Sequence, residues 1–292
     1  MAPGPDWEER ISRDTNPAIR IEHEARYRMA APVVRDAQVW CDLGCGNGIA
    51  AAAALGEPFD GLAVLVDVAE EALRQAEREI RAEHTVTLVA DLAAEEDLRR
   101  VRDALLEGGT SGGCITCFEV VEHLTSFVPL MEMLVELVER HRFTVALSVP
   151  NDAFWSINNP FHHTMWGEGA FEELRRLLPE DHLVSHQFAL QGSLTRVDGE
   201  HESPEMVEHE VPATATPTHL LVGMGPAASR LTGAAAVGAA NLVEERRWQR
   251  QRESDLAFLQ ALEGQLSEWR KYIHELEGRL GLPLSGTGDD SA

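Results

Sequence analysis

Short apolar runs alternate with longer amphipathic stretches over residues 38–151. The short runs are typical of buried strands, and the stretches between them have helical spacing. This alternation predicts parallel βαβ units with helices on both faces of a sheet, so the fold class is α/β. We expect strands at 37–44, 61–68, 86–92, 114–120 and 143–151, and helices at 49–55, 69–83, 97–108 and 127–140.

The pattern changes after Asn151. Residues 151–166 are rich in aromatic, Asn and His residues, which favours a loop on the substrate side of a site. A helix at 169–181 and two closing strands at 185–194 and 218–226 follow. The acidic segment 198–217 between those strands is long for a connection and predicts a flexible crossing or a lid.

A heptad pattern is present near the C-terminus. Apolar residues spaced alternately three and four apart predict about three heptads of an amphipathic helix, which either packs on its own domain or forms a coiled coil. We favour self-association or a protein partner through residues 256–280. The seam consists of Leu259, Leu262, Leu266, Trp269, Ile273, Leu276 and Leu280.

Composition narrows the range of partners. The formal net charge of the 292 residues is −24, and such a field repels phosphate backbones, so a long nucleic acid is disfavoured. No apolar segment approaches the roughly 20 residues that span a bilayer. The N-terminus has neither a basic start nor an apolar run, which leaves a cytoplasmic enzyme as the expectation.

The four cysteines are Cys41, Cys45, Cys114 and Cys117. The last two form a C-x-x-C, a spacing that also occurs in zinc and redox sites. Their surroundings predict a strand, however, and residues three apart on a strand point to opposite faces. We therefore expect buried, reduced cysteines.

The most specific motif is DLGCGNG at 42–48. Gly44, Gly46 and Gly48 follow a predicted strand and lead into a helix, where glycine permits a tight turn and lets backbone N–H groups approach a ligand. The spacing differs from the G-x-G-x-x-G of dinucleotide binders. Asp42, directly before the turn, suits a cationic group better than a pyrophosphate.

Acidic residues also stand at the ends of the next two strands. Asp67 ends the second strand, where a carboxylate can accept hydrogen bonds from ribose hydroxyls, and Asp91 ends the third, in reach of an adenine amine. Each alone is an ordinary turn or N-cap residue. Together with Asp42 they predict a ligand site at the carboxyl edge of the sheet.

With these motifs, residues 20–225 resemble the class I S-adenosylmethionine (SAM)-dependent methyltransferases. The resemblance implies a seven-stranded sheet whose last strand is antiparallel, in-line methyl transfer, and cofactor contacts by particular residues. The matching motif residues are Asp42, Gly44, Cys45, Gly46 and Gly48 in the glycine turn, Asp67 with Val68, Asp91 with Leu92, and Glu119 after the fourth strand.

The segment FEVVEHL allows three interpretations. We expect Glu119 to end a strand and Glu122 and His123 to open the next helix, so that all three face one side. His123 could be a general base oriented by Glu122. The three could instead bind a divalent cation such as Mg or Mn, with His162 or His163 as a further ligand. In the third interpretation, the acidic residues only stabilise a helix N-terminus.

This E-V-x-E-H-L segment is similar to that of ubiquinone-pathway O-methyltransferases and of metal-dependent small-RNA 2′-O-methyltransferases. In the second group, the resemblance implies a metal held by Glu119, Glu122, His123 and a later histidine. We expect a SAM-dependent O-methyltransferase that acts on a hydroxyl of a small molecule, sugar or glycosylated product. An RNA 2′-O-methyltransferase and a non-catalytic SAM-binding scaffold with a coiled-coil partner are the alternatives.

The expected domain organisation has four parts. A helical segment at 1–37 precedes a SAM-binding domain at 38–225. A helical or coiled-coil region at 226–282 and a disordered tail at 283–292 follow it.

Overall fold

The computed structural model describes residues 17–107, 111–155, 161–189 and 215–234, and in the C-terminal part residues 266–267, 269–273, 276 and 279. The chain divides into two units, Met1–Gly238 and Ala239–Ala292. The elements below belong to the first unit.

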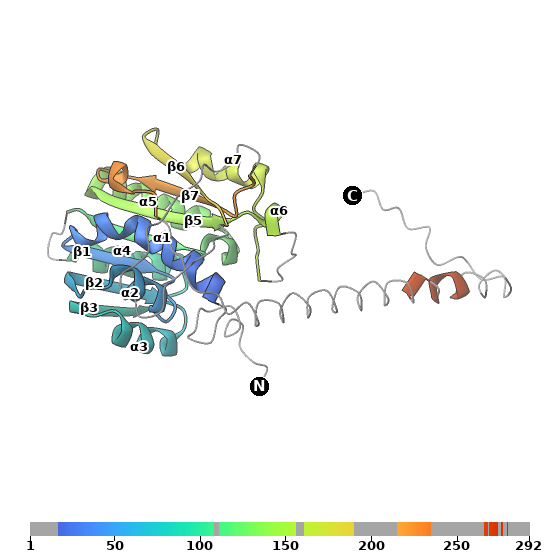
Figure 1. Cartoon of the computed structure of the whole chain (residues 1–292), viewed down its shortest axis with the longest axis horizontal. Helices are drawn as coiled ribbons and strands as arrows, with labels where there is room; N and C mark the ends of the chain where they lie inside the picture. Colours follow the sequence, from blue (N-terminus) through green and yellow to red (C-terminus); the bar gives the residue numbers. More distant parts are fainter. Residues whose placement is uncertain are drawn as a thin grey trace, which may run out of the picture. The chain divides into compact units, whose positions relative to one another are not determined.

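A seven-stranded sheet forms the centre of this unit (Figure 1). Its strand order is β3-β2-β1-β4-β5-β7-β6, and β7 runs antiparallel to both of its neighbours while the other described pairs are parallel. The prediction of an α/β fold with an antiparallel last strand is confirmed. The strands are β1 Val39–Leu43, β2 Phe59–Asp67, β3 Ala82–Val89, β4 Gly113–Phe118, β5 Phe143–Pro150, β6 His182–Gln187 and β7 His219–Met224.

Helices cover both faces of the sheet (Figure 1). One face carries α1 Pro17–Arg35, α2 Ile49–Leu55 and α3 Glu70–Glu79, and the other carries α4 Glu95–Leu106, α5 Val128–His141 and α7 Glu168–Leu177. A short helix, α6 Asp152–Trp155, follows β5, and two 3-10 turns are present, η2 Val121–His123 and η3 Ala228–Arg230.

The core lies in two layers, one on each side of the sheet. Strands β1, β4 and β5 are buried along almost their whole length, as expected for central parallel strands. All four cysteines are buried and unbridged. Cys114 and Cys117 belong to opposite layers, which confirms that the C-x-x-C is part of a strand.

Several expected boundaries were wrong, among them that of the strand expected at 185–194, which begins earlier, at His182, as β6. The helix predicted at 69–83 ends at Glu79, and β3 already begins at Ala82. Because β3 is an edge strand and most of its residues are partly or fully exposed, its polar first half gave no strand pattern. A further error concerns residues 151–166, where α6 replaces the start of the expected loop.

Some residues of the predicted C-terminal helix are described in the structure. Leu266, Trp269 and Ile273 are helical and exposed, and Leu276 is helical too. The remaining seam positions, most of the acidic segment 198–217 and the tail at 283–292 lie outside the described residues, so the coiled coil stays a prediction. Among the described residues, we find no helix with the length and apolar character needed to cross a bilayer.

Candidate active site

The glycine-rich turn connects β1 to α2. Gly44, Gly46 and Gly48 have φ angles of +69°, +54° and +73°, a region that residues with a Cβ rarely adopt. At Gly44, a Cβ would also lie 2.3 Å from Cγ2 of Val120. The turn therefore needs glycine for its conformation and, at Gly44, for the close approach of the β4–η2 connection.

Asp67 stabilises this turn from the neighbouring strand. Its Oδ2 accepts a hydrogen bond from the Gly46 N–H at 2.9 Å, and its Oδ1 accepts one from the Ala69 N–H at 2.8 Å. A carboxylate has about four lone-pair positions and can accept several hydrogen bonds at once. Val68, the next residue, is exposed.

Asp91 lies at the end of β3, on the same edge of the sheet. Its Oδ1 accepts a hydrogen bond from the Ala93 N–H, and its side chain is exposed, whereas Leu92 is buried. The strand order β3-β2-β1 thus places Asp91, Asp67 and Asp42 in succession along one half of the carboxyl edge. This is the arrangement that the sequence predicts.

Asp42 is fully buried at the end of β1. Its carboxylate accepts hydrogen bonds from the Tyr27 hydroxyl at 2.9 Å and the Thr116 hydroxyl at 2.6 Å. Burial raises the pKa of Asp42 to about 7, although both hydrogen bonds favour the ionised form. The roles of Tyr27 and Thr116 had no signal in the sequence, because neither belongs to a motif.

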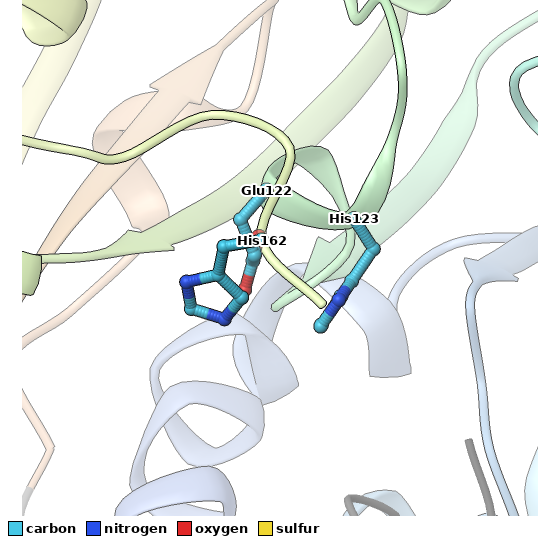
Figure 2. A group of neighbouring side chains, drawn as sticks. All are labelled: Glu122, His123 and His162. Atoms are coloured by element: carbon cyan, nitrogen blue, oxygen red, sulfur yellow. The ribbon is translucent and has the colours of Figure 1, made fainter. Parts of the chain in front are cut away.

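A cluster of possible metal ligands lies beyond β4. Glu122, His123 and His162 each place a ligand atom within 4.8 Å of the other two. Figure 2 shows Glu122 and His123 on the same short turn, with His162 joining them from the loop after α6. The exposed fraction of Glu122 is 1%, and in the described part of the chain its Oε2 has no hydrogen-bond partner. Burial, with the nearby Glu119 carboxylate, raises the pKa of Glu122 well above its usual range.

The histidines of this cluster are oriented by neighbouring acceptors. His162 Nδ1 lies 3.1 Å from Oδ1 of the buried Asp152, so Nδ1 carries the proton and Nε2 presents its lone pair. His123 Nδ1 lies 3.3 Å from the Phe161 carbonyl oxygen. The two rings meet edge to face at 5.1 Å. A buried, unpaired carboxylate oxygen beside two imidazoles fits a divalent cation.

Glu119 occupies a different position from the one predicted. It follows β4 with a φ of +56°, and its carboxylate accepts hydrogen bonds from the Ser148 hydroxyl at 2.7 Å and from His219 Nε2 at 3.1 Å. Burial disfavours its charge, but Arg26 and His219 outweigh that effect and hold the pKa of Glu119 well below its usual range. Glu119 is therefore ionised, and its carboxylate is not among the ligand atoms that come together at Glu122, His123 and His162.

The expected helix start at Glu122 was wrong. Val121–His123 form a separate 3-10 turn, Leu124 is extended, and α5 begins only at Val128, with a proline in its first turn. The 3-10 turn explains why Glu119 does not share a face with Glu122 and His123, since helical spacing does not apply across it.

The side chains near His162 and His163 do not all lie in one place. The backbone N–H of His163 donates to the Glu122 carbonyl oxygen, but the His163 side chain is exposed and outside the cluster. Trp166, one of the aromatic residues of the segment 151–166, is 1% exposed and packs against Phe127. Trp155 is partly buried and Phe161 is exposed.

Comparison with known proteins gives matches among solved structures alone. No family model matches the chain, and no curated protein does. It is similar to a SAM-dependent methyltransferase from Archaeoglobus fulgidus at 14% identity, over 71% of this chain and 94% of that one, with a TM-score of 0.44. Small RNA methyltransferase HEN1 matches at 16% identity over 77% of this chain and 28% of its own, with a TM-score of 0.48. The plantazolicin methyltransferase BpumL, solved in complex with SAH, matches at 13% identity over 72% and 84%, with a TM-score of 0.42.

Proposed function

We propose that this chain is a SAM-dependent O-methyltransferase. The observation that carries the proposal is the glycine turn after β1, with Asp42 before it and the Asp67 carboxylate bonded to the Gly46 N–H. A turn of this shape leaves room for a ligand to approach the backbone, and the two aspartates suit a cationic, ribose-bearing ligand. Asp91, with Leu92, is the third part of this proposed cofactor site and would contact the adenine.

When bound, SAM supplies an electrophilic methyl group on a sulfonium, which loses its positive charge as the methyl passes to a nucleophile. The acceptor approaches from the half of the carboxyl edge beyond β4, where Glu122, His123 and His162 gather. Holding the two reactants in line supplies much of the acceleration of such a reaction. The exposed Phe161 and the partly buried Trp155 flank this side of the edge.

The same proposal includes a divalent cation, Mg or Mn, held by Glu122, His123 and His162. Its support is the buried Glu122 Oε2 without a partner, which a cation would satisfy. A cation there would lower the pKa of an acceptor hydroxyl and orient it. Asp152 fixes the tautomer of His162. His123 acting as a general base without a cation is the alternative, and metal content separates the two.

Cofactor binding is tested with S-adenosylhomocysteine (SAH). We expect calorimetry to show one SAH per chain, and Asp67→Asn to weaken the affinity by about tenfold or more, since hydrogen bonds to a charged group contribute about 1.5–3 kcal/mol. The matched control is Asp60→Asn, an exposed aspartate on the same strand. A wild-type chain that does not bind SAH, or two variants that bind it equally, would refute the proposal.

The cation is tested by titration with Mn²⁺, followed by electron paramagnetic resonance. We expect one Mn²⁺ per chain, and binding at least about tenfold weaker in Glu122→Gln, because the amide has lost the charged ligand oxygen. His163→Ala should bind Mn²⁺ like the wild type, since its side chain lies outside the cluster. Loss of Mn²⁺ in His163→Ala but not in His162→Ala would contradict this ligand set.

A further inference from the structure

Helix α1 carries a fully buried arginine whose guanidinium is only partly hydrogen-bonded. Arg26 is 1% exposed, and its Nη1 donates to Oε1 of Gln187 at 2.9 Å. Its Nε and Nη2 are buried and have no hydrogen-bond partner among the residues that the structure describes. Leaving two donors of a charged group unpaired costs several kcal/mol in principle, so we expect a hydrogen-bond acceptor to bind at Nε and Nη2.

The geometry of the two unpaired donors indicates which hydrogen-bond acceptor would fit them. Nε and Nη2 form the side-on edge of the guanidinium, with two parallel N–H bonds that match the two oxygens of a carboxylate or phosphate. The end of the guanidinium at Nη1 is fixed by Gln187, whose amide in turn donates to the Glu22 carbonyl oxygen at 3.0 Å. The edge is therefore held in one orientation by its own helix and by β6.

The contacts of Arg26 lie on the β4–β6 half of the sheet, although the next residue, Tyr27, bonds to Asp42 on β1. Gln187 ends β6, the outermost strand, and Glu119, whose pKa is lowered by Arg26, follows β4. With strands about 4.8 Å apart, β6 lies on the order of 24 Å from β2, where Asp67 marks the ribose position. Arg26 thus belongs to the half of the edge between β4 and β6, on the acceptor side.

Some of the ionisable side chains near Arg26 are charged and others are neutral, and these charges determine which ligand can bind. Glu119 is ionised and offsets one positive charge, whereas burial raises the pKa of Glu22 and lowers that of His23 to about 3, which makes His23 neutral. The Glu122 carboxyl also interacts electrostatically with Arg26. The two unpaired donors of Arg26 match the two oxygens of a single anionic group.

We propose that the Nε–Nη2 edge of Arg26 binds a carboxylate or phosphate of the methyl acceptor. The inference rests on the proposed function and specifies its substrate class: a hydroxylated molecule that also carries one acidic group, such as a hydroxy acid, a sugar acid or a sugar phosphate. The acidic group is bound at Arg26 while the hydroxyl is presented at Glu122, His123 and His162.

The test uses the full chain saturated with SAH, with inorganic phosphate and acetate as probes at constant ionic strength. Each anion should raise the unfolding midpoint of the wild type as its concentration rises, by mass action. Arg26→Lys, which keeps the charge but loses the side-on edge, should bind the anions at least tenfold more weakly while its SAH affinity changes less than twofold. Arg28→Lys is the matched control, because Arg28 is exposed on the same helix and paired with Glu24.

Several results would overturn the inference. Equal anion responses in the wild type, Arg26→Lys and Arg28→Lys would show that the edge is structural. A tenfold loss of SAH affinity in Arg26→Lys would assign the edge to the cofactor's own carboxylate. If Arg26→Lys does not fold, wild-type crystals soaked in selenate decide, since no anomalous selenium peak at Arg26 would refute the site. A wild type that binds SAH but no anion refutes this inference alone, whereas failure to bind SAH refutes the proposed function.

Discussion

At the scale of single residues, Asp42 shows how burial can make the pKa of a carboxyl group sensitive to a nearby cation. Its neighbours are Tyr27, Thr116, Asp67 and Cys45, none of which is positively charged. Without a cation its pKa is about 7 because burial penalises the charge. A cationic ligand beside it would favour the ionised form, so the pKa of Asp42 should fall on binding and a proton should be released.

We therefore expect SAM to bind more tightly as pH rises through 7. The folded pKa is raised above the ordinary value, so below pH 7 binding must first remove a proton, and above pH 7 it need not. From pH 6 to pH 8 the affinity should rise by about tenfold, since one pKa unit corresponds to a factor of ten. Calorimetry of wild type and Asp42→Asn checks this. The variant should lose that dependence and keep only the titration of the ligand's own amino group. Equal profiles would contradict the role of Asp42.

Single residues also mark what the sequence could and could not predict. Glu122 and His123 are adjacent in a motif, and Asp67 and Asp91 stand at strand ends, so local spacing was enough to find them. Ser148 and His219 reach Glu119 from β5 and β7. Arg26 comes from α1. These contacts depend on strand order and on which way a side chain turns, and no short spacing in the chain encodes them.

At the scale of elements, the turn between β1 and α2 and the connection from β4 to η2 are packed against each other. Val120 fills the space beside Gly44, whereas no described residue other than its chain neighbours places a heavy atom within 4 Å of a Cβ built on Gly46. Both glycines have positive φ. The two positions therefore separate the effect of backbone conformation from that of close packing.

Gly44→Ala should lower the free energy of unfolding by about 2–4 kcal/mol, and Gly46→Ala by about 1 kcal/mol. Both changes place a Cβ at positive φ, but only the first adds a clash with Val120. Urea denaturation checks the difference. In a Val120→Ala background the cost of Gly44→Ala should decrease, because the clashing Cγ2 is gone. Equal costs for the two glycine variants would mean that Val120 does not constrain the turn.

The hydrophobic pattern of the sequence predicts some helices and strands better than others. β1, β4 and β5 are buried along almost their whole length and appear as continuous apolar runs. β3 is largely exposed, and η2 is only three residues long. Neither buries enough apolar surface to impose a period on the sequence, so their boundaries came from the structure.

At the scale of the whole unit, the strand order divides the carboxyl edge in two. Asp91 follows β3, whereas Asp67 and Asp42 lie at the ends of β2 and β1, and Glu119, His219 and Gln187 lie at β4, β7 and β6. In the proposed function, the first half holds the cofactor and the second holds an acceptor with a cation and an acidic group. The residues of the first half were found from motifs, whereas those of the second are brought together by long-range contacts. Self-association through residues 256–280 stays a prediction.

The most direct test of the account is a crystal structure of the full chain with SAH and Mn²⁺. We expect the ribose hydroxyls of SAH on Asp67, its adenine near Asp91, and one anomalous manganese peak roughly 2.0–2.3 Å from ligand atoms of Glu122, His123 and His162. SAH bound away from the glycine turn, or manganese bound away from the Glu122 carboxylate, would contradict it.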